Sequence, residues 1–84
     1  MTPSAEAIRA VILEFAAERG PARSFCPSEP ARRLGGDWRA LMPAVRAAAA
    51  QLQDDGAIHA TQRGVPVWAG QARGPIHLTL GRGP

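Results

Sequence analysis

The spacing of apolar residues changes once along this chain, at Gly56. Before Gly56, apolar residues recur every three to four positions, which is the period of an amphipathic α-helix. After it, apolar and polar residues alternate, as in Ile58, His59 and Ala60, and this is the period of a half-buried β-strand. The sequence therefore predicts a helical part followed by a small sheet.

Three helices are predicted in the first part. The first covers about residues 4–19, because its apolar residues fall on one helical face and Ser4 suits the N-cap position. The second begins at Pro27 or Ser28 and ends at the pair Gly35-Gly36. Either Ser28 caps this helix, or Pro27 is its first residue and Glu29 reaches back to the preceding backbone.

The third predicted helix begins at the N-cap residue Asp37 and ends at Gly56, which suits the position just after a helix. Proline lacks an N–H and its ring clashes with the preceding turn, so Pro43 predicts a kink or a 3₁₀ start before Met42. One face of this helix is predicted to be buried. Its residues are Trp38, Leu41, Val45, Ala48 and Leu52.

The alternating part predicts a β-hairpin and one further strand. Gln62-Arg63-Gly64 form the turn, where Gly64 supplies the positive φ of a tight hairpin. Pro66 restricts the return strand to a sheet edge, because proline cannot donate a hydrogen bond to a neighbouring strand. Residues 74–80 form the last strand, and Phe25, in the link between the first two helices, is expected to fill the core.

Three helices followed by a β-hairpin is the element order of a winged helix-turn-helix. The predicted fold class is mainly α with a small antiparallel β-sheet, in which the second and third helices form the helix-turn-helix and the β-hairpin is the wing. A chain of 84 residues makes a single domain. We expect residues 1–84 to form this domain, with frayed ends at 1–3 and 81–84.

Four blocks of the sequence resemble a known family. They are CPSEPAR, WRALMPAVR, DDGAI and RGPI, and the first two match the patterns CPSE.AR and WR.LMP.VR. Over residues 6–80 the chain is similar to a small bacterial family that is catalogued only as a domain of unknown function. The resemblance implies a winged-helix fold and brings no known activity. Pro30 stands where an aliphatic residue is more usual, which bears on the start of the second helix.

Composition narrows the classes of function. A domain this short has a small core and little room for a substrate pocket, so we expect no enzyme. Its ten arginines, seven acidic residues and no lysine give a net charge of +3, which suits an anionic partner. The single cysteine excludes an internal disulfide, and no segment approaches the roughly 20 apolar residues that span a bilayer. We therefore expect a cytoplasmic protein with no membrane partner.

The arginines of the predicted helix-turn-helix are candidates for binding double-stranded DNA, as in a transcription regulator. Arg39 and Arg46 are seven positions apart, so they share the outward face of the third helix, the face that enters the major groove in this fold. The two arginines that end the second helix would hold phosphates, and the hairpin tip would supply the contacts of the wing. The predicted DNA contacts are Arg32, Arg33, Arg39, Arg46, Gln62 and Arg63.

Each candidate also has a purely structural interpretation. Cations at the end of a helix interact favourably with the helix dipole, and any exposed hairpin tip is polar. Arg39 could pair with Glu29 or Asp37 instead of binding DNA. Arg73 could pair with Asp54 or Asp55, or touch a phosphate.

The outward strip of the third helix predicts a rival function. Ala40, Ala47 and Ala50 are expected there, and alanine cannot hydrogen-bond to a base edge. The alternative is therefore a protein–protein interaction module with a winged-helix fold and no DNA binding. Trp68, on the return strand, either covers the edge of the core or forms a patch between two copies in a homodimer.

No catalytic, cofactor or metal site is predicted. Cys26 has no committed His or Asp partner, so we expect it to act as a small apolar residue rather than as a nucleophile. His59 and His77 lack the further Cys or His residues of a zinc site.

Overall fold

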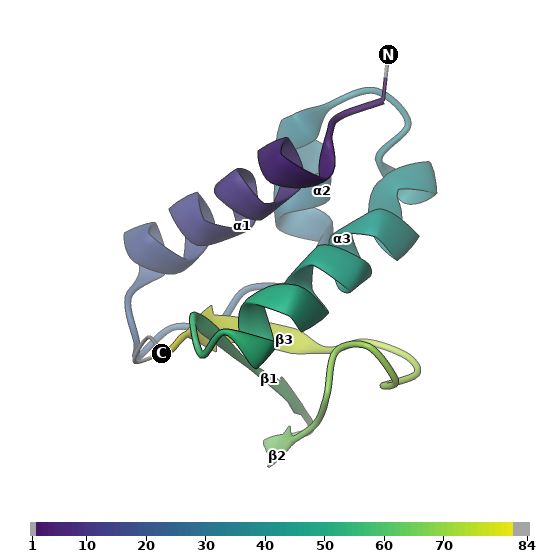
Figure 1. Cartoon of the computed structure of the whole chain (residues 1–84). Coiled ribbons are helices and arrows are strands. Elements are labelled where there is room, and N and C mark those ends of the chain that lie inside the picture. Colours follow the sequence, from purple (N-terminus) through teal and green to yellow (C-terminus); the bar gives the residue numbers. More distant parts are fainter. Residues whose placement is uncertain (1, 82–84) are drawn as a thin grey trace.

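The computed structural model describes residues 2–81. Three helices are followed by three strands, in the order that the sequence predicts (Figure 1). The elements are α1 (Ala5–Arg19), α2 (Ser28–Leu34), α3 (Trp38–Asp54), β1 (Ile58–Gln62), β2 (Val65–Pro66) and β3 (His77–Leu80). The helices lie on one side of the small sheet (Figure 1), and this winged-helix-like arrangement confirms the predicted fold class.

The helix ends follow from local chemistry. Ser4 Oγ accepts a hydrogen bond of 3.1 Å from the Ala7 N–H and caps α1. At α2, Glu29 Oε2 accepts a hydrogen bond of 2.9 Å from the Cys26 N–H, so Glu29 reaches back as one of the two predicted caps requires. Gly56, at φ +78°, follows α3 and ends it as predicted.

The third helix passes through Pro43 without a break. A 3₁₀-type hydrogen bond of 3.1 Å, from the Ala40 N–H to the Asp37 carbonyl, closes its first turn, whereas Met42 and Pro43 lie in regular α-helix. Proline is tolerated at this point because the carbonyl that loses its donor belongs to Arg39, an exposed residue that water can reach. Asp37 occupies the N-cap position, but its carboxylate makes no capping hydrogen bond.

The sheet is antiparallel with the strand order β2-β1-β3. A two-residue turn of Arg63 and Gly64 joins β1 to β2, and their φ values of +54° and +80° are those of a type I′ turn. Gln62, predicted as a turn residue, belongs to β1 and pairs with Val65. The strand with Pro66 lies at the edge, as predicted.

The last strand is shorter than predicted and begins at His77. Phe25 forms a β-bridge with Leu78 through backbone hydrogen bonds of 2.9 and 2.8 Å, and its side chain is 1% exposed. Its predicted place in the core is therefore confirmed. Of the ends predicted to fray, residues 1 and 82–84 lie outside the described residues.

The predicted inward face of α3 is buried in its second half. Val45, Ala48 and Leu52 are buried, whereas Trp38 and Leu41, in the first turns, are half-buried. The second half of α3 therefore belongs to the hydrophobic core.

One residue of the predicted outward strip is buried. Ala50 is 8% exposed, so its prediction as an outward residue is wrong. The cause is the irregular chain between β2 and β3, residues 67–76, which we call the wing loop. It is anchored by the buried side chains of Ala69 and Ile76 and lies against this side of α3.

Candidate nucleic-acid interface

Two arginines on the α1–α2 side are neutralised by glutamates. Arg19 Nη2 lies 2.6 Å from Glu29 Oε1. Arg33 Nη1 lies 3.1 Å from Glu18 Oε1 and 3.7 Å from Glu14 Oε2. Arg33, one of the predicted phosphate contacts, is therefore drawn toward α1 and already has carboxylate partners.

These ion pairs also shift the pKa values of Arg33 and Glu29. The hydrogen bond to Glu18 raises the pKa of Arg33. Partial burial tends to raise the pKa of Glu29, but hydrogen bonds from the Cys26 N–H and the Arg19 guanidinium outweigh it, so this pKa lies below its usual value.

Arg46, predicted to enter the major groove, is bound to the wing loop. Its Nη1 donates to the Ala72 carbonyl at 2.9 Å, and its Nη2 donates to the Gly74 carbonyl. The residue is half-buried. Both terminal guanidinium nitrogens thus serve the fold, and Arg46 presents no free fork for a phosphate or a base.

Gln62, predicted as a contact of the wing, has a similar role. Its Nε2 donates to the carbonyls of Arg73 and Pro75, the latter at 3.1 Å. The four successive carbonyls of residues 72–75 are therefore bound alternately by Arg46 from α3 and by Gln62 from β1. These two side chains fix a segment that has no regular secondary structure.

Gln53 is the third side chain that binds the wing loop. This role was not predicted from the sequence. Its Nε2 donates to the Val67 carbonyl at 2.7 Å, and its Oε1 accepts from the Ala69 N–H at 2.9 Å. Arg46, Ala50 and Gln53 recur at helical spacing, and this second stripe is the signal that could have revealed a covered face.

The exposed strip of α3 carries small, uncharged side chains in its middle turns. None of them can donate or accept a hydrogen bond at a base edge. Further along, Gln51 accepts a hydrogen bond of 2.8 Å from Arg9 Nη1 of α1. The exposed residues of the middle turns are Ala40, Pro43, Ala44 and Ala47.

Arg32 and Arg39 flank the corner between α2 and α3. Their guanidinium carbons each lie 4.6 Å from the ring centroid of Trp38, within cation–π distance. Both arginines are exposed, and neither forms an ion pair among residues 2–81. The alternative pairing of Arg39 with Glu29 or Asp37 is accordingly not found in this part of the chain.

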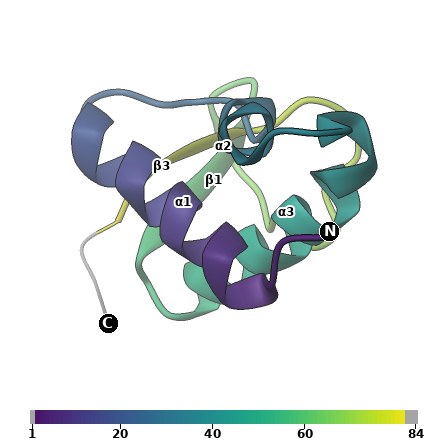
Figure 2. The ribbon, with the colours of Figure 1, turned by 90° about the horizontal axis from the view of Figure 1, so that it is seen from above.

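Arg63 and Arg73 carry positive charge on the wing. Both are exposed, and neither has a carboxylate within ion-pair distance in the described part of the chain. In Figure 1 the α2–α3 corner lies at the upper right and the wing loop at the lower right, and both remain on the right in Figure 2. The link between α1 and α2, which holds the exposed Arg23, lies at the opposite end.

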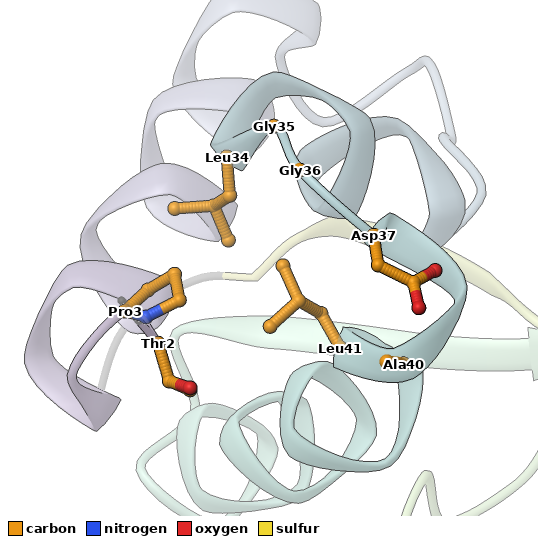
Figure 3. Close-up of a pocket in the computed structure, with 8 residues that line it drawn as sticks. All are labelled: Thr2, Pro3, Leu34, Gly35, Gly36, Asp37, Ala40 and Leu41. Carbon is orange, nitrogen blue, oxygen red and sulfur yellow. The ribbon is translucent and has the colours of Figure 1, made fainter.

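A pocket of about 320 Å³ lies beside the α2–α3 corner. Pro3, Leu34 and Leu41 line it, with the Asp37 carboxylate at its edge (Figure 3). Its lining is mainly apolar and its one charged residue is acidic, so it does not extend the basic surface.

A second pocket, of about 650 Å³, lies between the β1–β2 turn and the wing loop. We call it the wing pocket. Two arginines and one histidine line it, and no carboxylate does among the described residues. Its lining residues are Gln62, Arg63, Val65, Arg73, Gly74, Pro75 and His77.

Other predicted features carry no comparable site. Cys26 is half-buried and accepts a hydrogen bond of 3.2 Å from Ser28 Oγ. Trp68 is 44% exposed, with its ring against Gly70. Within residues 2–81, no three His, Cys, Asp or Glu side chains gather as metal ligands would, and no helix has the length and apolarity to cross a bilayer.

A comparison with known protein families identifies the family of this chain. A family described as "Protein of unknown function (DUF3253)" matches residues 5–81, so the chain belongs to this family, and the predicted resemblance to a domain of unknown function is confirmed. No curated protein matches the sequence.

Proposed function

We propose that this member of the DUF3253 family binds double-stranded DNA, chiefly through the phosphate backbone, as a transcription-regulator-like winged helix. The observation that carries the proposal is the division of the arginines. Arg19 and Arg33 are paired with glutamates between α1 and α2. Apart from Arg23 in the α1–α2 link, the arginines that are exposed without a carboxylate partner in the described chain are Arg32, Arg39, Arg63 and Arg73. These four belong to the α2–α3 corner and the wing, the parts with which a winged helix meets DNA.

Phosphate contacts, rather than base contacts, follow from the composition of α3. Ala40, Ala44 and Ala47 offer a flat and neutral strip, and the covered Arg46 removes the one cation in the middle of the helix. The middle turns of such a helix can approach the groove closely but cannot select a base by hydrogen bonding. We therefore expect affinity with little sequence preference, in a cytoplasmic protein that acts alone or as a dimer.

The same neutral strip supports a second candidate, a protein–protein interaction module. Helix surfaces of small residues let another backbone approach closely, and Pro43 adds apolar surface to the alanines. This function would use the strip itself and would not need the four exposed arginines.

Fluorescence anisotropy with short labelled duplexes separates the two candidates. If Arg32, Arg39, Arg63 and Arg73 each neutralise one phosphate, the logarithm of the binding constant falls with the logarithm of the salt concentration with a slope of about −3.6. Two duplexes of unrelated sequence should bind within a few-fold of each other. Absence of binding to either duplex at roughly 50 mM salt would contradict the DNA proposal and leave the interaction module.

A further inference from the structure

We propose that the wing pocket is a binding site for a small phosphate monoester, a ligand other than the DNA backbone. It shares Arg63 and Arg73 with the proposed DNA interface but needs neither Arg32 nor Arg39, so the two proposals can fail separately. Its volume of about 650 Å³ lies in the range of pockets that hold small organic molecules.

The charges of the pocket match a doubly charged phosphoryl group. Arg63, Arg73 and His77 line it, and no carboxylate does among the described residues. A phosphate monoester carries a charge of about −1.5 to −2 near neutral pH and offers three acceptor oxygens. A DNA phosphodiester carries a single charge, so the monoester is the better match for several cationic donors.

The backbone beneath Arg73 is held in place before any ligand arrives. Arg46 binds the carbonyls of residues 72 and 74, and Gln62 binds those of residues 73 and 75. Little backbone freedom is then lost on binding, which is the general advantage of a preorganised site. A loop that is fixed at four successive carbonyls can present the Arg73 side chain to a ligand in a defined position.

The backbone conformation of Arg63 also supports a phosphate-binding role for the pocket. Arg63, at φ +54°, is the non-glycine residue with positive φ in the described chain. Asparagine or glycine would form the same type I′ turn with less strain. A strained arginine at the rim of a basic pocket therefore indicates a role for its guanidinium rather than for the turn.

The remaining lining suits the organic part of an ester. The Val65 side chain is 60% exposed, and Pro75 lines the pocket with it. These apolar surfaces would contact a carbon skeleton while the arginines hold the phosphoryl group.

The test is an NMR titration of the full chain with phenyl phosphate at constant ionic strength, following backbone amides. We expect saturable shifts at Arg63, Gly74 and His77. Dimethyl phosphate, a diester with one charge, should bind at least about tenfold more weakly. Shifts that do not saturate, or equal affinity for the diester, would overturn the proposal. So would shifts of these amides on addition of duplex DNA but none on addition of phenyl phosphate, because the pocket would then serve the DNA interface alone.

Two variants assign the effect to the guanidinium groups. Arg63→Asn keeps a residue that favours the type I′ turn, and Arg73→Gln keeps the carbonyl that Gln62 binds, so both should fold. Each substitution should weaken the affinity for phenyl phosphate by at least about tenfold, or about 1.4 kcal/mol. The matched control Arg39→Gln should keep full affinity for phenyl phosphate. Unchanged affinity in both pocket variants contradicts the assignment.

Discussion

Arg46 of α3 and Gln62 of β1 bind alternate carbonyl oxygens of one segment of the wing loop. Arg46 reaches residues 72 and 74, and Gln62 reaches residues 73 and 75. Two side chains from different elements thus replace the backbone pairing that the loop lacks. The wing is attached to the helical part by side-chain hydrogen bonds as well as by the strands.

Replacing Arg46 should destabilise the domain. Arg46→Met keeps much of the aliphatic bulk but removes both hydrogen bonds to the wing loop. We expect the free energy of unfolding to fall by about 1.5–3 kcal/mol, the range for hydrogen bonds to charged groups. Urea denaturation measures this loss. Arg23→Met, in the exposed link, should change stability by less than about 0.5 kcal/mol, and an equal effect of the two substitutions would contradict the role of Arg46.

Relieving the strain at Arg63 should stabilise the protein. An L-residue in the left-handed region costs about 1 kcal/mol, and asparagine tolerates that region better than arginine does. Arg63→Asn should therefore raise the free energy of unfolding by about 0.5–1 kcal/mol, seen as a higher thermal midpoint. A lower midpoint would show that the guanidinium stabilises the fold itself.

Lowering the pH should destabilise the protein at the start of α2, because Glu29 becomes protonated. The pKa of Glu29 is lower in the folded chain than in the unfolded chain, so its contribution is complete above the unfolded pKa, about 4.3. It is lost as the pH falls from there through the folded pKa. Glu29→Gln can still accept the Cys26 N–H but cannot titrate. Unfolding followed between about pH 6 and pH 3 should be less pH-dependent in this variant, and an identical profile would contradict the account.

DNA binding should be visible in the fluorescence of Trp38. The two tryptophans of the chain are Trp38 and Trp68, so Trp68→Phe leaves Trp38 as the sole reporter. If phosphates draw Arg32 and Arg39 away from the ring, its emission should change on addition of duplex DNA. The change should disappear when both arginines are replaced, in the variant Arg32→Gln/Arg39→Gln. If the change persists in that variant, DNA does not act on Trp38 through these two arginines, which would contradict the prediction.

The helices and the hairpin could be predicted because their signals are local. Ser4, Gly56 and Pro66 act through their own backbone or that of near neighbours, and each has the predicted role or position. The sheet alternation at Ile58 and Ala60 is likewise a property of a few consecutive residues, and both are buried.

The candidate site was less predictable because it depends on the wing loop, which has no periodic pattern. Helical spacing places Arg46 and Gln53 on one face but does not say that residues 67–75 cover it. The ion pairs of Arg33 could not be predicted for a related reason, since its partners Glu14 and Glu18 come from a different helix. Long-range partners decide which arginines remain exposed, and sequence spacing alone does not contain them.

The salt dependence of DNA binding in paired variants tests the central claim most directly. Anisotropy titrations of the wild type over a range of salt concentrations should give a slope of about −3.6. Arg32→Gln/Arg39→Gln should reduce it to about −1.8, because two phosphate contacts are lost. Arg23→Gln, which removes an exposed arginine at the opposite end, should leave the slope unchanged. A slope that falls equally in both variants, or no binding at roughly 50 mM salt, would contradict the assignment of the α2–α3 corner and the wing as a DNA interface.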